Sequence, residues 1–136
     1  MDRSVVLGVA VISTWALAAC DRSSPPARPP VQGAAVRAEV DRLTLAYSNC
    51  VDAKARTRPI ADEVAGTLAD TFEAECAPAR ATLAAKTAIF YRIGHPRTSP
   101  GQAANVADAS VKNLEDEIRS RAVIAIVERQ NAAKAK

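Results

Sequence analysis

Three long stretches of this chain repeat apolar residues every three or four positions, the period of an α-helix with one buried face. The first stretch runs from Ala34 to about Arg56, and Thr57-Arg58-Pro59 ends it because a residue before proline leaves the α region. Its apolar positions are Val36, Val40, Leu43, Tyr47, Cys50 and Val51.

The second stretch begins at Pro59, a favourable first helical residue, and ends near Gly94. Pro78 interrupts this stretch: it has no amide proton and clashes with the carbonyl of Ala74, so we expect a kink or break there. The apolar positions are Ile60, Val64, Leu68, Phe72, Cys76, Ala79, Leu83 and Phe90.

The third stretch runs from about Gln102 to Ala132, after a loop rich in glycine and proline at residues 94–102. No alternating strand pattern competes with these helices. Short connections place successive helices side by side and antiparallel, so the sequence predicts an all-α, up-down-up three-helix bundle whose second helix is kinked near Pro78. The third apolar stripe is Val106, Val111, Leu114, Ile118, Ala122, Ala125 and Ile126.

The N-terminus carries a different pattern. Arg3 precedes an apolar run over residues 5–16, which is followed by Leu17-Ala18-Ala19-Cys20. Residues 1–20 resemble the signal peptide of a bacterial lipoprotein, with the last four as its lipobox. The resemblance implies cleavage between Ala19 and Cys20, acylation of the Cys20 thiol and a stable membrane anchor. The alternatives are an ordinary signal peptide that leaves a free cysteine, or a short uncleaved membrane helix.

This interpretation divides the chain into three parts. Residues 1–19 are the signal peptide, residues 20–33 are the lipidated cysteine and a proline-rich linker, and residues 34–136 are the helical domain. Removing 19 of 136 residues leaves 117, enough for one domain with a small core. The resemblance places the chain in the bacterial cell envelope, lipid-anchored and facing the periplasm. Asp21 resembles the inner-membrane retention signal of enterobacterial lipoproteins.

The cysteine count agrees with export. If Cys20 carries lipid, Cys50 and Cys76 remain as a pair for a disulfide in an oxidising compartment. Free thiols and an intermolecular bridge are the alternatives. In a plain helical hairpin the two residues would lie roughly 16 Å apart along the axis, too far for a bridge. A longer connection or a steep helix crossing would bring them together; otherwise no bridge forms.

Candidate chemistry is sparse, and we predict no catalytic residue, no metal site and no cofactor. His95 is the only histidine and lies in the loop between Gly94 and Pro96, where a solvated side chain is expected. The acidic residues 115–117 point about 100° apart on a helix and are interpreted as a solvated face, balanced by neighbouring cations. Glu73 and Glu75 lie two positions apart, on different faces, and are interpreted as surface residues.

A formal charge of +3 is too small to indicate a nucleic-acid partner, although weak attraction to anionic lipid headgroups is compatible with it. Two functions remain. The first is a non-enzymatic domain that binds or scaffolds an unknown envelope protein, held at the membrane by the lipid. The second is a small-ligand or hydrolase-inhibitor module, which would require a contiguous exposed apolar groove.

Overall fold

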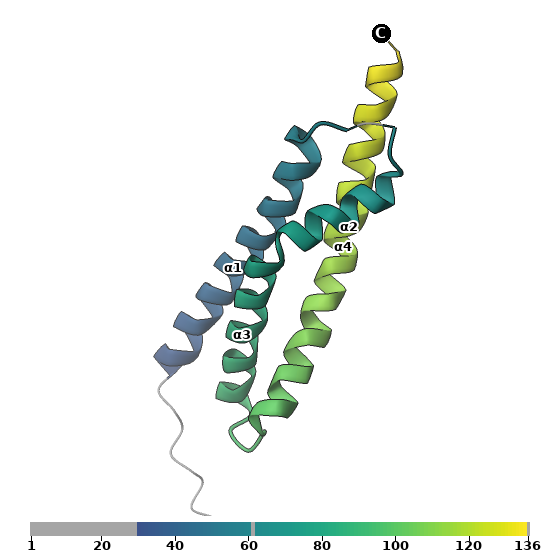
Figure 1. The fold of residues 1–136 in the computed structure, drawn as a ribbon. Coiled ribbons are helices and arrows are strands. Elements are labelled where there is room, and N and C mark those ends of the chain that lie inside the picture. Colours follow the sequence, from purple (N-terminus) through teal and green to yellow (C-terminus); the bar gives the residue numbers. More distant parts are fainter. Residues whose placement is uncertain (1–29, 61, 136) are drawn as a thin grey trace, which may run out of the picture.

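The computed structural model describes residues 30–60 and 62–135, and within these residues it contains helices and no strand (Figure 1). The all-α class is confirmed. The expected count of three helices is wrong, because four are present in the described residues: α1 (Pro30–Thr57), α2 (Ala65–Glu75), α3 (Ala77–Gly94) and α4 (Pro100–Lys134).

The extra helix arises because the expected second helix is divided at Cys76. This residue has φ −97° and ψ 7°, and its amide donates to the carbonyls of Phe72 and Glu73 to close α2. Pro78 then lies in the first turn of α3, where no amide proton is needed. The break near Pro78 is therefore confirmed, and its reason is that proline cannot donate to the preceding turn.

The expected helix start at Pro59 is wrong, since α2 begins at Ala65. Residues 58–60 and 62–64, which lie in the connection between α1 and α2, are instead non-helical. Ile60 is half-buried in this connection, whereas Val64 is 73% exposed, so the apolar stripe does not continue through it. Ile60 and Val64 have helical spacing relative to Leu68, but two apolar residues at the right spacing do not by themselves form a packed helix face.

Side chains of α4 hold this connection in place. Arg129 donates from Nη1 to the carbonyl of Ala55 at 2.8 Å and from Nη2 to the carbonyl of Arg58 at 3.0 Å. Gln130 Nε2 donates to the carbonyl of Glu63 at 2.9 Å. The end of α1 leaves carbonyls without intrahelical partners, and Arg129 supplies one of them with a charged donor.

The helices α1, α3 and α4 run up, down and up as expected, and α2 lies across α4 while also contacting α1 (Figure 1). Because α2 departs from the bundle direction, the three long helices form the bundle and α2 covers part of one side. None of the helices in residues 30–60 and 62–135 has the length and apolar character that a bilayer span requires.

The core is formed by buried side chains from all four helices of the described chain. Its fully buried large side chains are Tyr47, Val51, Phe72, Cys76, Leu83, Ile118 and Ile126. On α4 the first turns are buried through Ala103 and Ala107, whereas Val106, which was expected in the stripe, is 37% exposed. The residues buried in these first turns are therefore small alanines.

Two helix ends differ slightly from expectation. α1 begins at Pro30 rather than Ala34, so residues 30–33 belong to its first turn. α4 begins at Pro100 rather than Gln102, because Ser99 and Gln102 form a capping box: Ser99 Oγ accepts from the Gln102 amide at 3.3 Å, and Gln102 Oε1 accepts from the Ser99 amide at 3.1 Å.

Candidate functional site

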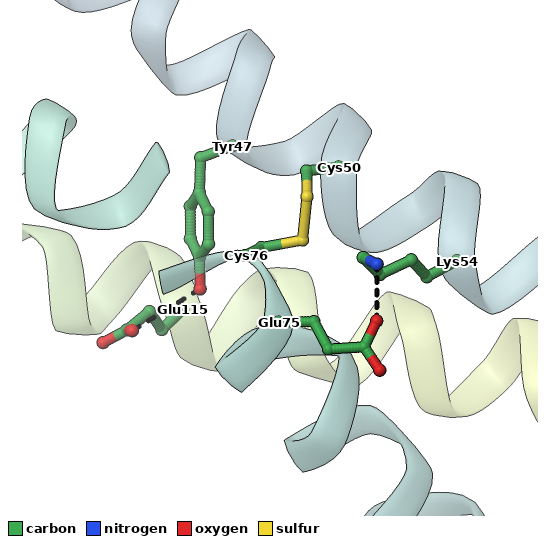
Figure 2. The surroundings of a disulfide bond; sticks show 6 residues. All are labelled: Tyr47, Cys50, Lys54, Glu75, Cys76 and Glu115. Carbon is green, nitrogen blue, oxygen red and sulfur yellow. Dashed lines mark hydrogen bonds and ion pairs between the residues drawn. A yellow bond between two sulfur atoms is a disulfide. The ribbon is translucent and has the colours of Figure 1, made fainter. Parts of the chain in front are cut away.

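Cys50 of α1 and Cys76, between α2 and α3, are joined in a disulfide with Cα atoms 6.1 Å apart (Figure 2). Both of the proposed solutions to the hairpin mismatch occur. The connection over residues 58–64 is long, and α2 crosses the bundle instead of following it. The disulfide therefore fastens the break between α2 and α3 to the middle of α1.

A polar group lies beside the disulfide where α1, α3 and α4 meet. Arg80 Nε donates to Glu115 Oε1 at 2.6 Å and Arg80 Nη2 donates to Glu115 Oε2 at 3.3 Å. The hydroxyl of Tyr47 also donates to Glu115 Oε1, at 3.4 Å (Figure 2). Asp108 adds a 3.5 Å ion pair to Arg80. The interpretation of residues 115–117 as a fully solvated face is therefore wrong for Glu115, whose side chain is only 18% exposed.

Burial raises the pKa of the Tyr47 phenol, and the nearby carboxylates of Glu115 and Glu73 raise it further. The phenol therefore stays protonated and able to donate across the neutral range. Ion pairing with Glu115 raises the pKa of Arg80, so the guanidinium keeps its charge. These groups form a stable hydrogen-bonded link between three helices, and neither Tyr47 nor Arg80 is poised to exchange a proton near neutral pH.

Glu73 on α2 differs from the surface residue that the sequence predicts. Its Oε1 is buried without a hydrogen-bond partner. Loss of hydration raises the pKa of Glu73, and the Glu115 carboxylate raises it further, while Arg119 opposes the change. The side chain as a whole is only half-buried. Glu73 is therefore a position on α2 where one carboxylate oxygen is covered by the fold but is not hydrogen-bonded.

Glu75 fits the surface interpretation and links two elements (Figure 2). Its Oε2 accepts from Lys54 Nζ at 2.5 Å and its Oε1 accepts from Arg58 Nη2 at 2.8 Å. Hydrogen bonding to Lys54 lowers the pKa of Glu75. On the other side of α2, Asp70 accepts from Arg119 Nε at 2.6 Å. Exposed ion pairs thus hold both flanks of α2.

The remaining acidic residues of the 115–117 run do lie on a solvated face. Asp116 pairs with Lys112 at 3.7 Å and Glu117 pairs with Arg121 at 3.3 Å, each one helical turn away. Arg121 also donates to Ser48 Oγ of α1 at 2.6 Å. This part of the prediction is confirmed.

The loop between α3 and α4 forms the other notable surface. His95 is exposed, as the sequence predicts, and its ring lies 4.4 Å from that of Tyr91, centroid to centroid. Two shallow hollows adjoin these rings. One, of about 360 Å³, is lined by residues 94–98; the other, of about 330 Å³, is lined by Phe90, Tyr91, Ile93, Gly94 and His95. Aromatic rings and Pro96 line these hollows, which are open to solvent and do not form an enclosed pocket.

The remaining candidates fall outside the described residues or on separate elements. Ala19 and Cys20, the expected cleavage and lipidation site, lie outside residues 30–60 and 62–135. Within those residues no group of three or more histidine, cysteine or acidic side chains could hold a metal ion. Sequence reasoning missed the contact of Arg80 with Glu115. The position of Glu115 beside the apolar stripe, next to Leu114, signals partial burial but does not identify the partner.

Comparisons with known proteins identify no relative. The chain matches no protein family, no curated protein and no solved structure. The function must therefore be inferred from the chain itself.

Proposed function

We propose that this protein is a bacterial envelope lipoprotein, held in the membrane through Cys20, whose helical domain binds or scaffolds other envelope proteins without catalysing a reaction. The expected location faces the periplasm. The lipobox resemblance of residues 17–20 supports the anchor, and the described helices support a rigid domain that follows it.

The observation that carries this proposal is the pairing of Cys50 with Cys76. A disulfide in a small domain is typical of proteins exported to oxidising compartments. The pairing also uses two of the three cysteines, so that Cys20 is left for acylation. An exported lipoprotein accounts for both the disulfide and the remaining cysteine. A cytoplasmic protein would account for neither, because disulfides are rare in the cytoplasm.

The distribution of apolar side chains on the surface favours a binding or scaffolding function rather than the binding of a small ligand in a pocket. The exposed large apolar side chains lie on different elements: Leu45 on α1, Val64 before α2, Ile89 on α3, and Val106, Ile124 and Val127 on α4. The hollows beside the α3–α4 loop are open to solvent. A domain stiffened by a disulfide and inter-helix ion pairs presents such side chains at fixed positions to a partner.

Replacing Cys20 with Ser tests the anchor. We expect the parent chain to remain in the membrane fraction and its N-terminal peptide to carry acyl mass, and the Cys20→Ser chain to lose both. The matched control is the double variant Cys50→Ser with Cys76→Ser, which keeps the lipobox and should stay in the membrane. Unchanged membrane retention of Cys20→Ser would refute the proposal.

Site-specific photo-crosslinking tests the interaction role. A photoreactive residue at Leu45 or Ile124, which are 63% and 58% exposed, should form a discrete protein adduct in intact cells. The same residue at Ala55, which is fully buried, is the negative control. If no adduct forms at any exposed position while lipid or peptide co-purifies with the chain, the small-ligand or inhibitor function is favoured instead.

A further inference from the structure

The bundle end at which α1 begins is also the end at which α3 passes into α4 (Figure 1). Gly33, in the first turn of α1, lies against the last turn of α3: a Cβ at Gly33 would be 3.9 Å from Ile93 Cγ2. Only nine residues, 21–29, separate Cys20 from the first residue of α1. Even fully extended, such a segment reaches about 35 Å, so an anchor at Cys20 keeps this end of the bundle near the membrane.

Charge is distributed unevenly along the bundle. The acidic residues of the described chain all lie within residues 39–75 and 108–128, and residues 30–38 and 76–107 contain none. The acid-free segments include the beginning of α1, all of α3, the α3–α4 loop and the first turns of α4. These segments carry Arg37, Lys86, Arg92 and Arg97 in addition to Arg80, which is occupied by Glu115. The end nearest the expected anchor is therefore positively charged.

Three of these cations have no partner among the described residues. Arg37, Arg92 and Arg97 are exposed, and they form no hydrogen bond or ion pair with the described residues. Lys86 lies close enough to lower the pKa of Glu39, which itself pairs with Arg42. Arginines left free of carboxylates on one surface are available to an external anion.

Apolar and aromatic side chains accompany the arginines. Ile89 is 50% exposed, and Phe90, Tyr91 and Ile93 are only half-buried. The shallow hollows described above lie among these residues and the loop. Aromatic rings and basic residues together are typical of protein surfaces at the membrane–water boundary.

We propose that this basic end of the bundle, defined by Arg37, Arg92, Arg97 and the aromatic residues beside the α3–α4 loop, rests on the anionic phospholipid headgroups of the membrane that holds the chain. The inference rests on the proposed anchor, since the tether keeps the two surfaces within reach. Individual headgroup contacts are weak, but tethering raises their effective concentration. One lipid anchor together with a basic surface also holds more firmly than either alone.

Hydrogen exchange of the purified full-length chain in vesicles tests this contact. Amides of residues 89–99 should exchange more slowly in vesicles containing phosphatidylglycerol than in vesicles of phosphatidylcholine alone, and added salt should abolish the difference. The double variant Arg92→Gln with Arg97→Gln should weaken docking by about 25-fold, about five-fold for each arginine. The matched control is Arg56→Gln with Lys134→Gln, which removes two exposed charges from the opposite end and should dock like the parent.

Equal exchange of residues 89–99 in both kinds of vesicle would overturn the inference, as would an equal loss of docking in the control variant. Protection by glycerol phosphate without vesicles would assign the arginines to a soluble anion and also overturn it. The mass of the Cys20 peptide is measured on the same sample. An acylated peptide without protection refutes the docking alone, whereas an unacylated peptide refutes the proposed anchor.

Discussion

Arg80 of α3 and Glu115 of α4 form a two-point contact, with Nε–Oε1 at 2.6 Å and Nη2–Oε2 at 3.3 Å. Tyr47 of α1 donates to the same carboxylate. The three residues come from three different helices, so this contact aligns the long helices with one another at the level where α2 leaves the bundle.

Glu115→Gln should lower the free energy of unfolding by about 2 kcal/mol, because Arg80 loses a partly buried charged hydrogen-bond partner. Glu75→Gln is the matched control: it removes the same charge from a side chain that is 31% exposed, and exposed ion pairs contribute about 0.5 kcal/mol. Urea denaturation followed by circular dichroism measures both. Equal losses in the two variants would contradict the special position of Glu115.

Tyr47→Phe should cost about 1 kcal/mol. The phenol ring is fully buried and would keep its packing, but the hydroxyl would no longer donate to Glu115. Tyr91→Phe is the control, since Tyr91 is half-buried and contacts His95 through its ring rather than its hydroxyl. Thermal unfolding of both variants should show a lower Tm for Tyr47→Phe only.

Glu73→Gln should stabilise the protein near pH 7 by about 1 kcal/mol, since it removes a charge from a carboxyl with one buried, unpartnered oxygen. The pKa of Glu73 is raised in the folded state. The folded protein therefore holds this proton more tightly than the unfolded chain, and stability falls as pH rises from the ordinary glutamate pKa through the raised one.

The gain from Glu73→Gln should accordingly shrink as the pH is lowered toward 4, where Glu73 of the parent is itself protonated. Denaturation curves at several pH values measure this trend. Glu128→Gln, which removes the same charge from an exposed position of α4, is the control and should not stabilise the protein at pH 7. A gain from Glu73→Gln that is the same at pH 4 and pH 7 would contradict the assignment.

Removing the disulfide should cost about 3.5 kcal/mol, the chain-entropy value for the sequence separation of 26 between Cys50 and Cys76. The double variant Cys50→Ala with Cys76→Ala and the reduced parent should show similar losses in denaturation. Amides of α2 should lose protection from hydrogen exchange first, because the disulfide holds the end of that helix. Cys20→Ser, which leaves the disulfide intact, should retain the parent stability.

Local sequence rules predicted much of this fold. The spacing of Leu43, Tyr47 and Val51 identified the buried face of α1, and Ile118, Ala122 and Ile126 identified that of α4. Pro78 predicted the break between α2 and α3, because proline has no amide proton and interrupts the hydrogen bonds of any helix interior. Each of these predictions depends on residues within one or two helical turns of each other.

The predictions that were wrong concern residues whose contacts come from a distant helix. Pro59 and Ile60 fit a helical pattern, yet the chain there is a connection that Arg129 of α4 holds through backbone carbonyls. Glu115 lies in an acidic run that is typical of a solvated face, but its side chain contacts Arg80 of α3 and Tyr47 of α1. No local pattern encodes a partner that lies 35 or 74 positions away.

The sequence by itself determined the helical periods, the break before Pro78 and the supply of cysteines, because these follow from backbone chemistry and short-range spacing. Tertiary structure alone decided that α2 lies across the bundle, that Cys50 and Cys76 meet, and that unpaired arginines gather at the end where α1 begins. Those outcomes depend on how whole helices pack, and packing energies belong to surfaces that come together only in the folded chain.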